Sequence, residues 1–261
     1  MKRINRAGKF TAVALTAVMT LSLAACGRQD SGSQGTAEQK EYIYVPEYLE
    51  LDNDTNSSYN SLTVQGDKLY YINYKWSEDS GESQIALGSY NLTDGTREDI
   101  PVAIDGNNGG INSMQVDADG NIYTAEYQWN ATEGDDAYSQ QKTVLHKYDS
   151  TGAQVMEQDI TDIMQQDENN SYISSMSIDD QGRFYVSSNE LIRLFDTDGQ
   201  FQGDVKTDSS WIQGMGKGAD GKVYISYYDD AGNNTLAEID FDGKKIGQTY
   251  SNFPNVMVTG A

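Results

Sequence analysis

Tyrosine and tryptophan recur at fixed distances after similar stretches of the chain. Counted from Leu69 and from Ile122, a tyrosine follows after five residues and a tryptophan after seven; Val223 is followed by a tyrosine after five. These aromatic side chains are Tyr74, Trp76, Tyr127, Trp129 and Tyr228. Each has a flat apolar face and a polar tip, which suits stacking on a sugar ring or gripping a peptide. The interpretation that we favour, however, is that they pack one repeat against the next.

Acid–base and metal chemistry have few candidates. His146 is the only histidine, so a Ser-His-Asp triad would have to use it, yet the sequence has no Gly-x-Ser-x-Gly elbow. A lone histidine at the start of a strand is more often structural. Clusters of His and Cys that would bind zinc or iron are absent from the sequence. We therefore predict no catalytic residue, no bound metal and no cofactor.

Two further patterns are interpreted as turns. Residues Gly216–Gly221 satisfy G-x-G-x-x-G, but they precede a predicted strand and match the turns of the other repeats, so no dinucleotide site is implied. Asp117, Asp196 and Asp240 lie in Asp-rich turns that recur at equivalent hairpin positions. Their carboxylates are expected to stabilise the turns.

The charge balance is strongly acidic. The 261 residues carry a formal net charge of −22, and residues 1–25 contribute four basic side chains and no acidic one, so the remainder stands at −26. Such a field repels nucleic acid and anionic headgroups. Nucleic acid is therefore excluded as an expected partner.

The N-terminus combines a basic stretch, Met1–Arg6, with a short apolar run, Phe10–Ala25, which is typical of a secretory signal and short for a membrane span. Leu23-Ala24-Ala25-Cys26 resembles the lipobox of bacterial lipoproteins, in which the cysteine sulfur is diacylated and becomes the mature N-terminus. Cys26 is also the only cysteine. We predict lipidation at Cys26, a flexible polar tether over 26–41, and a location on the extracytoplasmic face of the cell membrane.

The rest of the chain follows one repeated unit, which is clearest in Met176–Val205. Alternating apolar residues predict a strand ending near Ile178, strands over 183–187 and 191–195, and a fourth strand from Gln200, separated by turns at 180–182 and 197–199. Related first hairpins begin at Leu62, Met114 and Met215. The insert 160–170 is predicted to contain a short helical turn. The pattern indicates four-stranded antiparallel units.

Four-stranded repeats of about 40 residues, none able to bury both faces alone, are typical of β-propeller blades. The sequence predicts an all-β propeller with about four blades. The expected divisions are a signal peptide at 1–25, the tether at 26–41, and a propeller at 42–261 with blades near 42–105, 106–165, 166–208 and 209–252 and the start of a further blade at 253–261.

The recurring pattern of an apolar residue, Asp-x-x-Gly, a second apolar residue and Tyr, followed by an aromatic-Asp-x-x-Gly hairpin, resembles the blades of NHL and gluconolactonase-like propellers. Together with the lipobox, the chain resembles Gram-positive extracellular solute-binding lipoproteins that carry a propeller. The resemblance implies an importer of the ABC type, whose permease and ATPase would be separate chains. Blade motifs specify fold more than function.

The C-terminal residues Met257–Ala261 align with Met215–Ala219, one blade later. We expect them to begin the first hairpin of another blade, so that the ring formed by this chain is incomplete and the chain is the N-terminal part of a longer product. The alternative is a closed ring of four blades.

The sequence favours a non-catalytic, lipid-anchored binding module; it does not identify the ligand, for which a carbohydrate and a peptide both stay open. Two alternatives stay open at this point. One is a metal-dependent lactonase-like hydrolase with carboxylate and Asn ligands at the channel mouth. The other is a surface scaffold for protein interactions.

Overall fold

The computed structural model describes residues 49, 57–77, 83–100, 102, 109–129, 141–167, 171–209 and 211–251. The predicted signal peptide, Cys26, the tether and the start of a further blade at 253–261 lie outside these residues. The prediction of an incomplete ring therefore stays a prediction.

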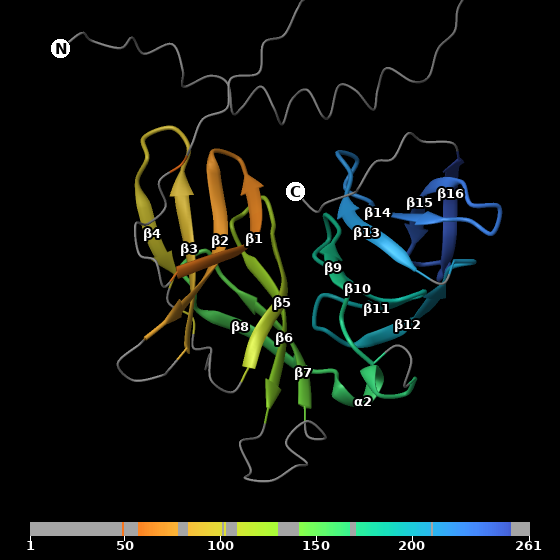
Figure 1. Ribbon diagram of the computed structural model, residues 1–261, viewed down its shortest axis with the longest axis horizontal. Helices are drawn as coiled ribbons and strands as arrows, with labels where there is room; N and C mark the ends of the chain where they lie inside the picture. The colour runs from red at the N-terminus through yellow and green to blue at the C-terminus, as the bar shows by residue number, and fades with distance from the viewer. Residues whose placement is uncertain are drawn as a thin grey trace, which may run out of the picture.

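The described residues form four separate antiparallel sheets of four strands each, with the strands in sequence order (Figure 1). Blade 1 consists of β1 (Ser57–Gln65), β2 (Lys68–Trp76), β3 (Ser83–Asn91) and β4 (Arg97–Ile100), and blade 2 of β5 (Gly109–Val116), β6 (Ile122–Trp129), β7 (Gln141–Tyr148) and β8 (Gln154–Asp159). Blade 3 consists of β9 (Ser175–Ile178), β10 (Phe184–Ser188), β11 (Leu191–Phe195) and β12 (Phe201–Lys206), and blade 4 of β13 (Ile212–Lys217), β14 (Val223–Tyr228), β15 (Asn234–Asp240) and β16 (Lys245–Ser251). One short helix in the described part, α2 (Thr161–Met164), lies between blades 2 and 3.

The predicted fold class is confirmed: the protein is an all-β propeller with four blades in its described part. The strands and turns expected over 176–205 coincide with β9 to β12, and the helical turn expected within 160–170 is α2. These elements were predictable because their signals, alternating side chains and Asp-Gly turns, are local.

An Asp-x-x-Gly turn closes several of the hairpins. In the first hairpin of blade 3, the amide of Gly182 donates to the carbonyl of Asp179, and Asp179 Oδ1 accepts from the amides of Gln181 (2.9 Å) and Arg183 (3.0 Å). Gly182 has φ +77°, a conformation that glycine adopts without steric cost. The side chains of Asp117, Asp149, Asp196 and Asp229 accept the same two hydrogen bonds, from the amides two and four residues later. One short motif thus closes hairpins after the first strand, after the third strand and, in blade 4, after the second strand.

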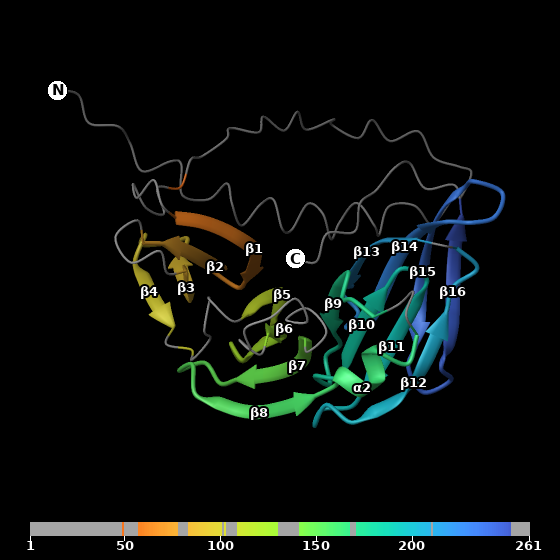
Figure 2. The ribbon, with the colours of Figure 1, turned by 60° about the horizontal axis from the view of Figure 1, so that its bottom comes forward.

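The four sheets are arranged in an arc around their first strands (Figures 1 and 2). The first strands pack in succession, β1 beside β5, β5 beside β9 and β9 beside β13. Within the ranges that the structure describes, β13 makes no comparable contact with β1.

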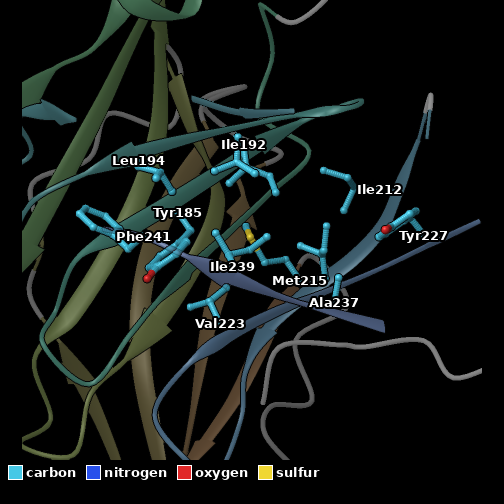
Figure 3. Close-up of a cluster of buried hydrophobic side chains, with 12 residues drawn as sticks. Tyr185, Ile192, Leu194, Ile212, Met215, Val223, Tyr227, Ala237, Ile239 and Phe241 are labelled. Atoms are coloured by element: carbon cyan, nitrogen blue, oxygen red, sulfur yellow. The ribbon is translucent and has the colours of Figure 1, made fainter. Parts of the chain in front are cut away.

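A hydrophobic core fills each space between successive blades. Blades 3 and 4 share a core to which blade 3 contributes Tyr185, Ile192, Leu194 and Val205, and blade 4 contributes eight side chains from Ile212 to Phe241 (Figure 3). Tyr185 and Phe241 meet edge to face, with ring centroids 5.5 Å apart. Corresponding cores join blades 1 and 2, and blades 2 and 3. Burial of apolar surface between the blades therefore holds the arc together.

Candidate functional site

The two rims of the propeller differ in what they carry. Because the strands alternate in direction, the hairpin turns after the first and third strand of every blade lie on one rim, which we call the turn rim. The loops after the second strands and the connections between blades lie on the other rim, the loop rim. Trp76, Trp129 and Tyr228 are the last residues of β2, β6 and β14, so they stand at the loop rim.

Exposed aromatic side chains gather at the loop rim. Among the described residues, the large aromatic side chains with exposed surface are Trp76 (52%), Tyr172 (46%), Phe201 (37%), Trp211 (59%) and Tyr228 (43%). Only Phe201, which follows a turn at the start of β12, lies at the turn rim. Single exposed aromatic side chains are common on protein surfaces, but their concentration on one rim sets the loop rim apart from the turn rim.

A hollow of about 590 Å³ opens on the loop rim between blades 3 and 4. The turn between β10 and β11, the connection from blade 3 to blade 4, and the loop after β14 contribute its walls, which are lined by Glu190, Lys206, Thr207, Asp208, Ser209 and Asp230. We call it the rim hollow. Trp211 and Tyr228 are not among its lining residues, but they lie on the same two segments: Trp211 follows Ser209 by two residues, and Tyr228 precedes Asp230 by two.

Hydrogen bonds fix the walls of the rim hollow. The amide of Thr207 donates to the carbonyl of Glu190 at 3.0 Å, and the Thr207 hydroxyl donates to the carbonyl of Ser209 at 2.8 Å. The Trp211 amide donates to the Ser209 hydroxyl oxygen at 3.2 Å. The connection is therefore held to blade 3 before a ligand arrives, which reduces the entropy that binding would cost.

The charges of the rim hollow are mainly acidic. Lys206 forms an ion pair with Glu190 at 2.8 Å, and this hydrogen bond raises the pKa of Lys206 above its ordinary value. Nearby, burial and the charges of Asp208 and Asp229 raise the pKa of Tyr227. The hollow itself offers carboxylates and two hydroxyl-bearing residues, and exposed aromatic rings lie on the segments that form it. This combination suits a polar ligand with flat apolar faces.

The predicted aromatic residues do not share one environment. Trp76 and Tyr228 are exposed at the loop rim, whereas the Tyr74 hydroxyl turns to the neighbouring blade and lies 3.1 Å from the carbonyl oxygen and 3.2 Å from the amide nitrogen of Ile111. Tyr127 is half-buried, and a Cβ at Gly110 would overlap its hydroxyl. The side chain of Trp129 lies outside the described part of the structure. Tyr74 therefore packs between blades 1 and 2.

Sequence inspection missed Tyr172 and Trp211, although a signal for them exists. Each stands four residues before the methionine that begins its repeat, Met176 and Met215 respectively. That position falls on the connection entering the first strand, at the loop rim. The rim hollow itself joins residues from three separate segments and has no comparable signal in one stretch.

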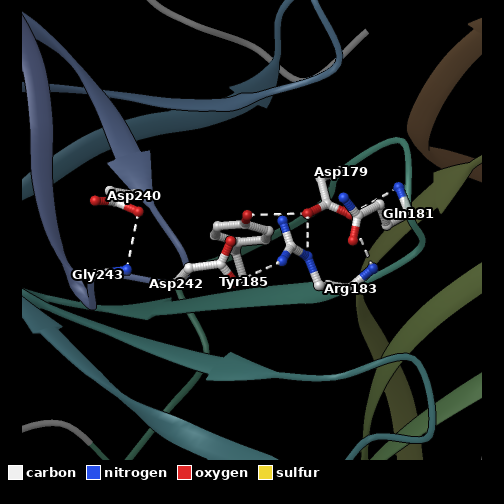
Figure 4. A network of polar contacts seen from close by, with 7 residues as sticks. All are labelled: Asp179, Gln181, Arg183, Tyr185, Asp240, Asp242 and Gly243. Carbon is white, nitrogen blue, oxygen red and sulfur yellow. Dashed lines mark hydrogen bonds and ion pairs between the residues drawn. The ribbon is translucent and has the colours of Figure 1, made fainter.

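At the turn rim, a polar network joins blades 3 and 4 (Figure 4). Asp179 Oδ2 accepts hydrogen bonds from Arg183 Nε at 2.6 Å and from the Tyr185 hydroxyl at 3.1 Å. Arg183 also reaches Asp242 of blade 4 at 3.1 Å and lies over the Phe241 ring, 4.1 Å from its centroid. Burial and the Asp179 charge raise the pKa of Tyr185. The charged groups of this network pair with one another, so we assign it a structural role.

Other site types find little support in the described residues. No group of three or more His, Cys, Asp or Glu side chains there could hold a metal ion. His146 does not line the rim hollow; it lies between Glu126 and Glu157 in blade 2. No helix in the described ranges is both long and apolar enough to cross a bilayer.

No protein-family model and no curated protein matches the chain. Solved structures do. A protein of unknown function from Bacteroides caccae is 12% identical with a TM-score of 0.48, over 76% of this chain and 62% of that chain. The β-propeller domain of the Trilobed protease from Pyrococcus furiosus is 12% identical with a TM-score of 0.44, over 77% and 58%. A gluconolactonase from Xanthomonas campestris is 14% identical with a TM-score of 0.41, over 70% and 58%. The chain spans about three fifths of the length of these proteins.

Proposed function

We propose that this chain is a non-catalytic binding module whose loop rim, around the rim hollow, takes a carbohydrate or peptide ligand. The observation that carries the proposal is the placement of exposed aromatic side chains: four of the five in the described residues lie at the loop rim. Trp211 and Tyr228 lie on the segments that form a hollow whose polar walls are already held by hydrogen bonds.

The chemistry of the rim hollow supports a sugar or a peptide in particular. Aromatic rings stack on the apolar face of a pyranose or on a peptide side chain, and the carboxylates of Asp208 and Asp230 accept hydrogen bonds from hydroxyl or amide groups. The hydroxyl groups of Thr207 and Ser209 already serve the backbone of the connection. They position the walls while the carboxylates face the ligand.

The proposed setting is the outer face of the cell membrane. The signal sequence and the lipobox cysteine support anchoring through lipid on Cys26, with a polar tether between anchor and propeller. In that place a binding module would serve as the receptor of an importer of the ABC type, with permease subunits as partners. This part of the proposal rests on the sequence alone.

Binding is tested by screening the purified chain on a panel of soluble oligosaccharides and short peptides, followed by calorimetry on the compounds that bind. W211A and Y228A should each weaken binding about tenfold or more, because loss of a stacked aromatic ring commonly removes more than about 1.4 kcal/mol. F201A is the matched control, an exposed aromatic on the turn rim, and should leave affinity unchanged. Equal effects of W211A and F201A would contradict the proposed site.

The setting is tested separately by metabolic labelling with a palmitate analogue in a bacterial host. The wild-type chain should be labelled and membrane-associated, whereas C26S should be neither. Calcium-dependent hydrolysis of lactones by the purified protein would contradict the non-catalytic assignment.

A further inference from the structure

His146 lies between two carboxylates inside blade 2. Its Nδ1 stands 3.0 Å from Oε1 of Glu126, and its Nε2 stands 3.4 Å from Oε2 of Glu157. The side chains of His146 and Glu126 are only 5% and 1% exposed, whereas that of Glu157 is 59% exposed. His146 Nδ1 has no directed hydrogen-bond partner, so its contact with Glu126 becomes an ion pair only when the imidazole is protonated.

Glu126 is a buried carboxylate at a boundary between blades. Its Oε1 accepts hydrogen bonds from the hydroxyl groups of Thr124 (2.5 Å) and Tyr148 (3.1 Å). Tyr148 belongs to the core that joins blades 1 and 2. From blade 1, Tyr74 lies close enough that the charge of Glu126 contributes to the raised pKa of its hydroxyl, after the larger effect of burial.

Two neutral hydroxyl groups do not replace a countercharge for a carboxylate removed from water. An unpaired buried charge is costly, whereas a pair at 3 Å recovers much of that cost. A protonated imidazole supplies the positive charge, and a neutral imidazole does not. The pair thus depends on a single proton.

We propose that His146 is a proton-operated switch for the boundary between blades 1 and 2. When protonated, it neutralises Glu126 and holds the boundary closed. When it loses its proton, the buried carboxylate faces only neutral groups, and the boundary opens more readily. This inference is independent of the proposed ligand.

The groups around His146 set the direction of the effect. Burial alone lowers the pKa of His146, but the contacts with Glu126 and Glu157 raise it above 6.5 overall. The groups that face it or its partners are Glu126 and Tyr127 on β6, Tyr148 and Lys142 on β7, Glu157 on β8, and Tyr74 on β2. Because the folded-state pKa is raised, the stabilisation is fully present below pH 6.5 and is lost as pH rises through the folded pKa.

The composition makes the switch measurable. His146 is the only histidine and Cys26 the only cysteine, so few other groups have an ordinary pKa between pH 6 and 9. An NMR titration of ¹⁵N-histidine-labelled protein follows one imidazole. Its midpoint should lie above 6.5, and E126Q should lower it more than the exposed control E157Q. A wild-type midpoint at or below 6.5 would overturn the proposal.

Opening of the boundary is followed by hydrogen exchange and by melting temperature between pH 6 and 9. After correction for intrinsic rates, amides of β2 and β6 should lose protection as His146 deprotonates, while those of β14 and β15 should not. The melting temperature of the wild type should fall over the same range, and that of H146Q should stay flat. The variant C26S serves as a control for titration of the single thiol in this pH range. An identical dependence of melting temperature on pH in the wild type and in H146Q would also overturn the proposal. If a variant folds poorly, the NMR titration of the wild type still tests the proposal.

Discussion

Asp179 is the position at which a single substitution should separate turn chemistry from the joint between blades. Its Oδ1 accepts two backbone amides of its own turn, and its Oδ2 accepts from Arg183 and Tyr185. Asp149 closes an equivalent turn in blade 2 with the same two backbone contacts, 2.9 Å from Thr151 and 3.1 Å from Ala153. Asp149 is half-buried and, among the described residues, accepts otherwise only from the Thr151 hydroxyl of its own turn, so it serves as the matched control.

The expected cost follows from what D179A leaves behind. Tyr185 is 2% exposed, so its hydroxyl loses its acceptor in a place that water does not reach, at about 1–3 kcal/mol. The charged hydrogen bond to Arg183 is worth about 1.5–3 kcal/mol, part of which survives because Arg183 keeps Asp242 and the Phe241 ring. We therefore expect D179A to lower the free energy of unfolding by about 4 kcal/mol, and D149A to lower it far less.

Equilibrium urea denaturation at pH 7, followed by tryptophan fluorescence, measures both variants. D179N adds a sharper comparison. Its single side-chain oxygen can still accept from the turn amides, and an uncharged NH₂ group then faces Arg183 and Tyr185. It should lose most of what D179A loses. If D179A and D149A cost the same, or if D179N behaves as the wild type, the network contributes nothing beyond the turn and the reasoning fails.

Four further substitutions test the packing and one hydrogen bond. G182A and G232A both place an alanine at φ near +78°, which costs about 1 kcal/mol. Only at Gly182 would the new Cβ meet a neighbour, the Tyr123 hydroxyl at 2.8 Å. Urea denaturation should therefore show a larger loss of stability for G182A than for G232A. L194A empties a fully buried site in the core between blades 3 and 4 and should cost about 2–5 kcal/mol, seen as a lower melting temperature. Y123F removes the 3.0 Å hydrogen bond to Asp117 while keeping the buried ring, and should cost about 1–2 kcal/mol in the same urea assay.

The hairpins were predictable because an Asp-Gly turn and alternating side chains act over fewer than ten residues, as the match between the expected and observed strands of blade 3 demonstrates. The rim hollow was not, because Glu190, Asp208 and Asp230 come together only once blades 3 and 4 have packed. Tyr74 illustrates the same limit. Its spacing matches that of Tyr127, yet its hydroxyl contacts the backbone of blade 2, and spacing does not reveal which way a side chain turns.

The environment of His146 was equally hidden. Thr124 pairs with His146 across β6 and β7, which brings Glu126, two residues along the same face, within reach. That register spans the insert between the two strands, and the sequence of the insert does not determine it. A histidine predicted as structural therefore also lies 3.0 Å from a buried carboxylate.

The sharing of each core between successive blades has a consequence for how damage spreads. Blades 2 and 3 each contribute to two cores, whereas, within the described residues, blades 1 and 4 each contribute to one. A linear array with nearest-neighbour coupling loses its ends before its middle. Among the described blades, a disturbance of blade 2 or blade 3 should therefore reach two neighbours, whereas a disturbance of blade 1 or blade 4 should reach one. Whole blades would then be the units by which such a chain lengthens or shortens during evolution.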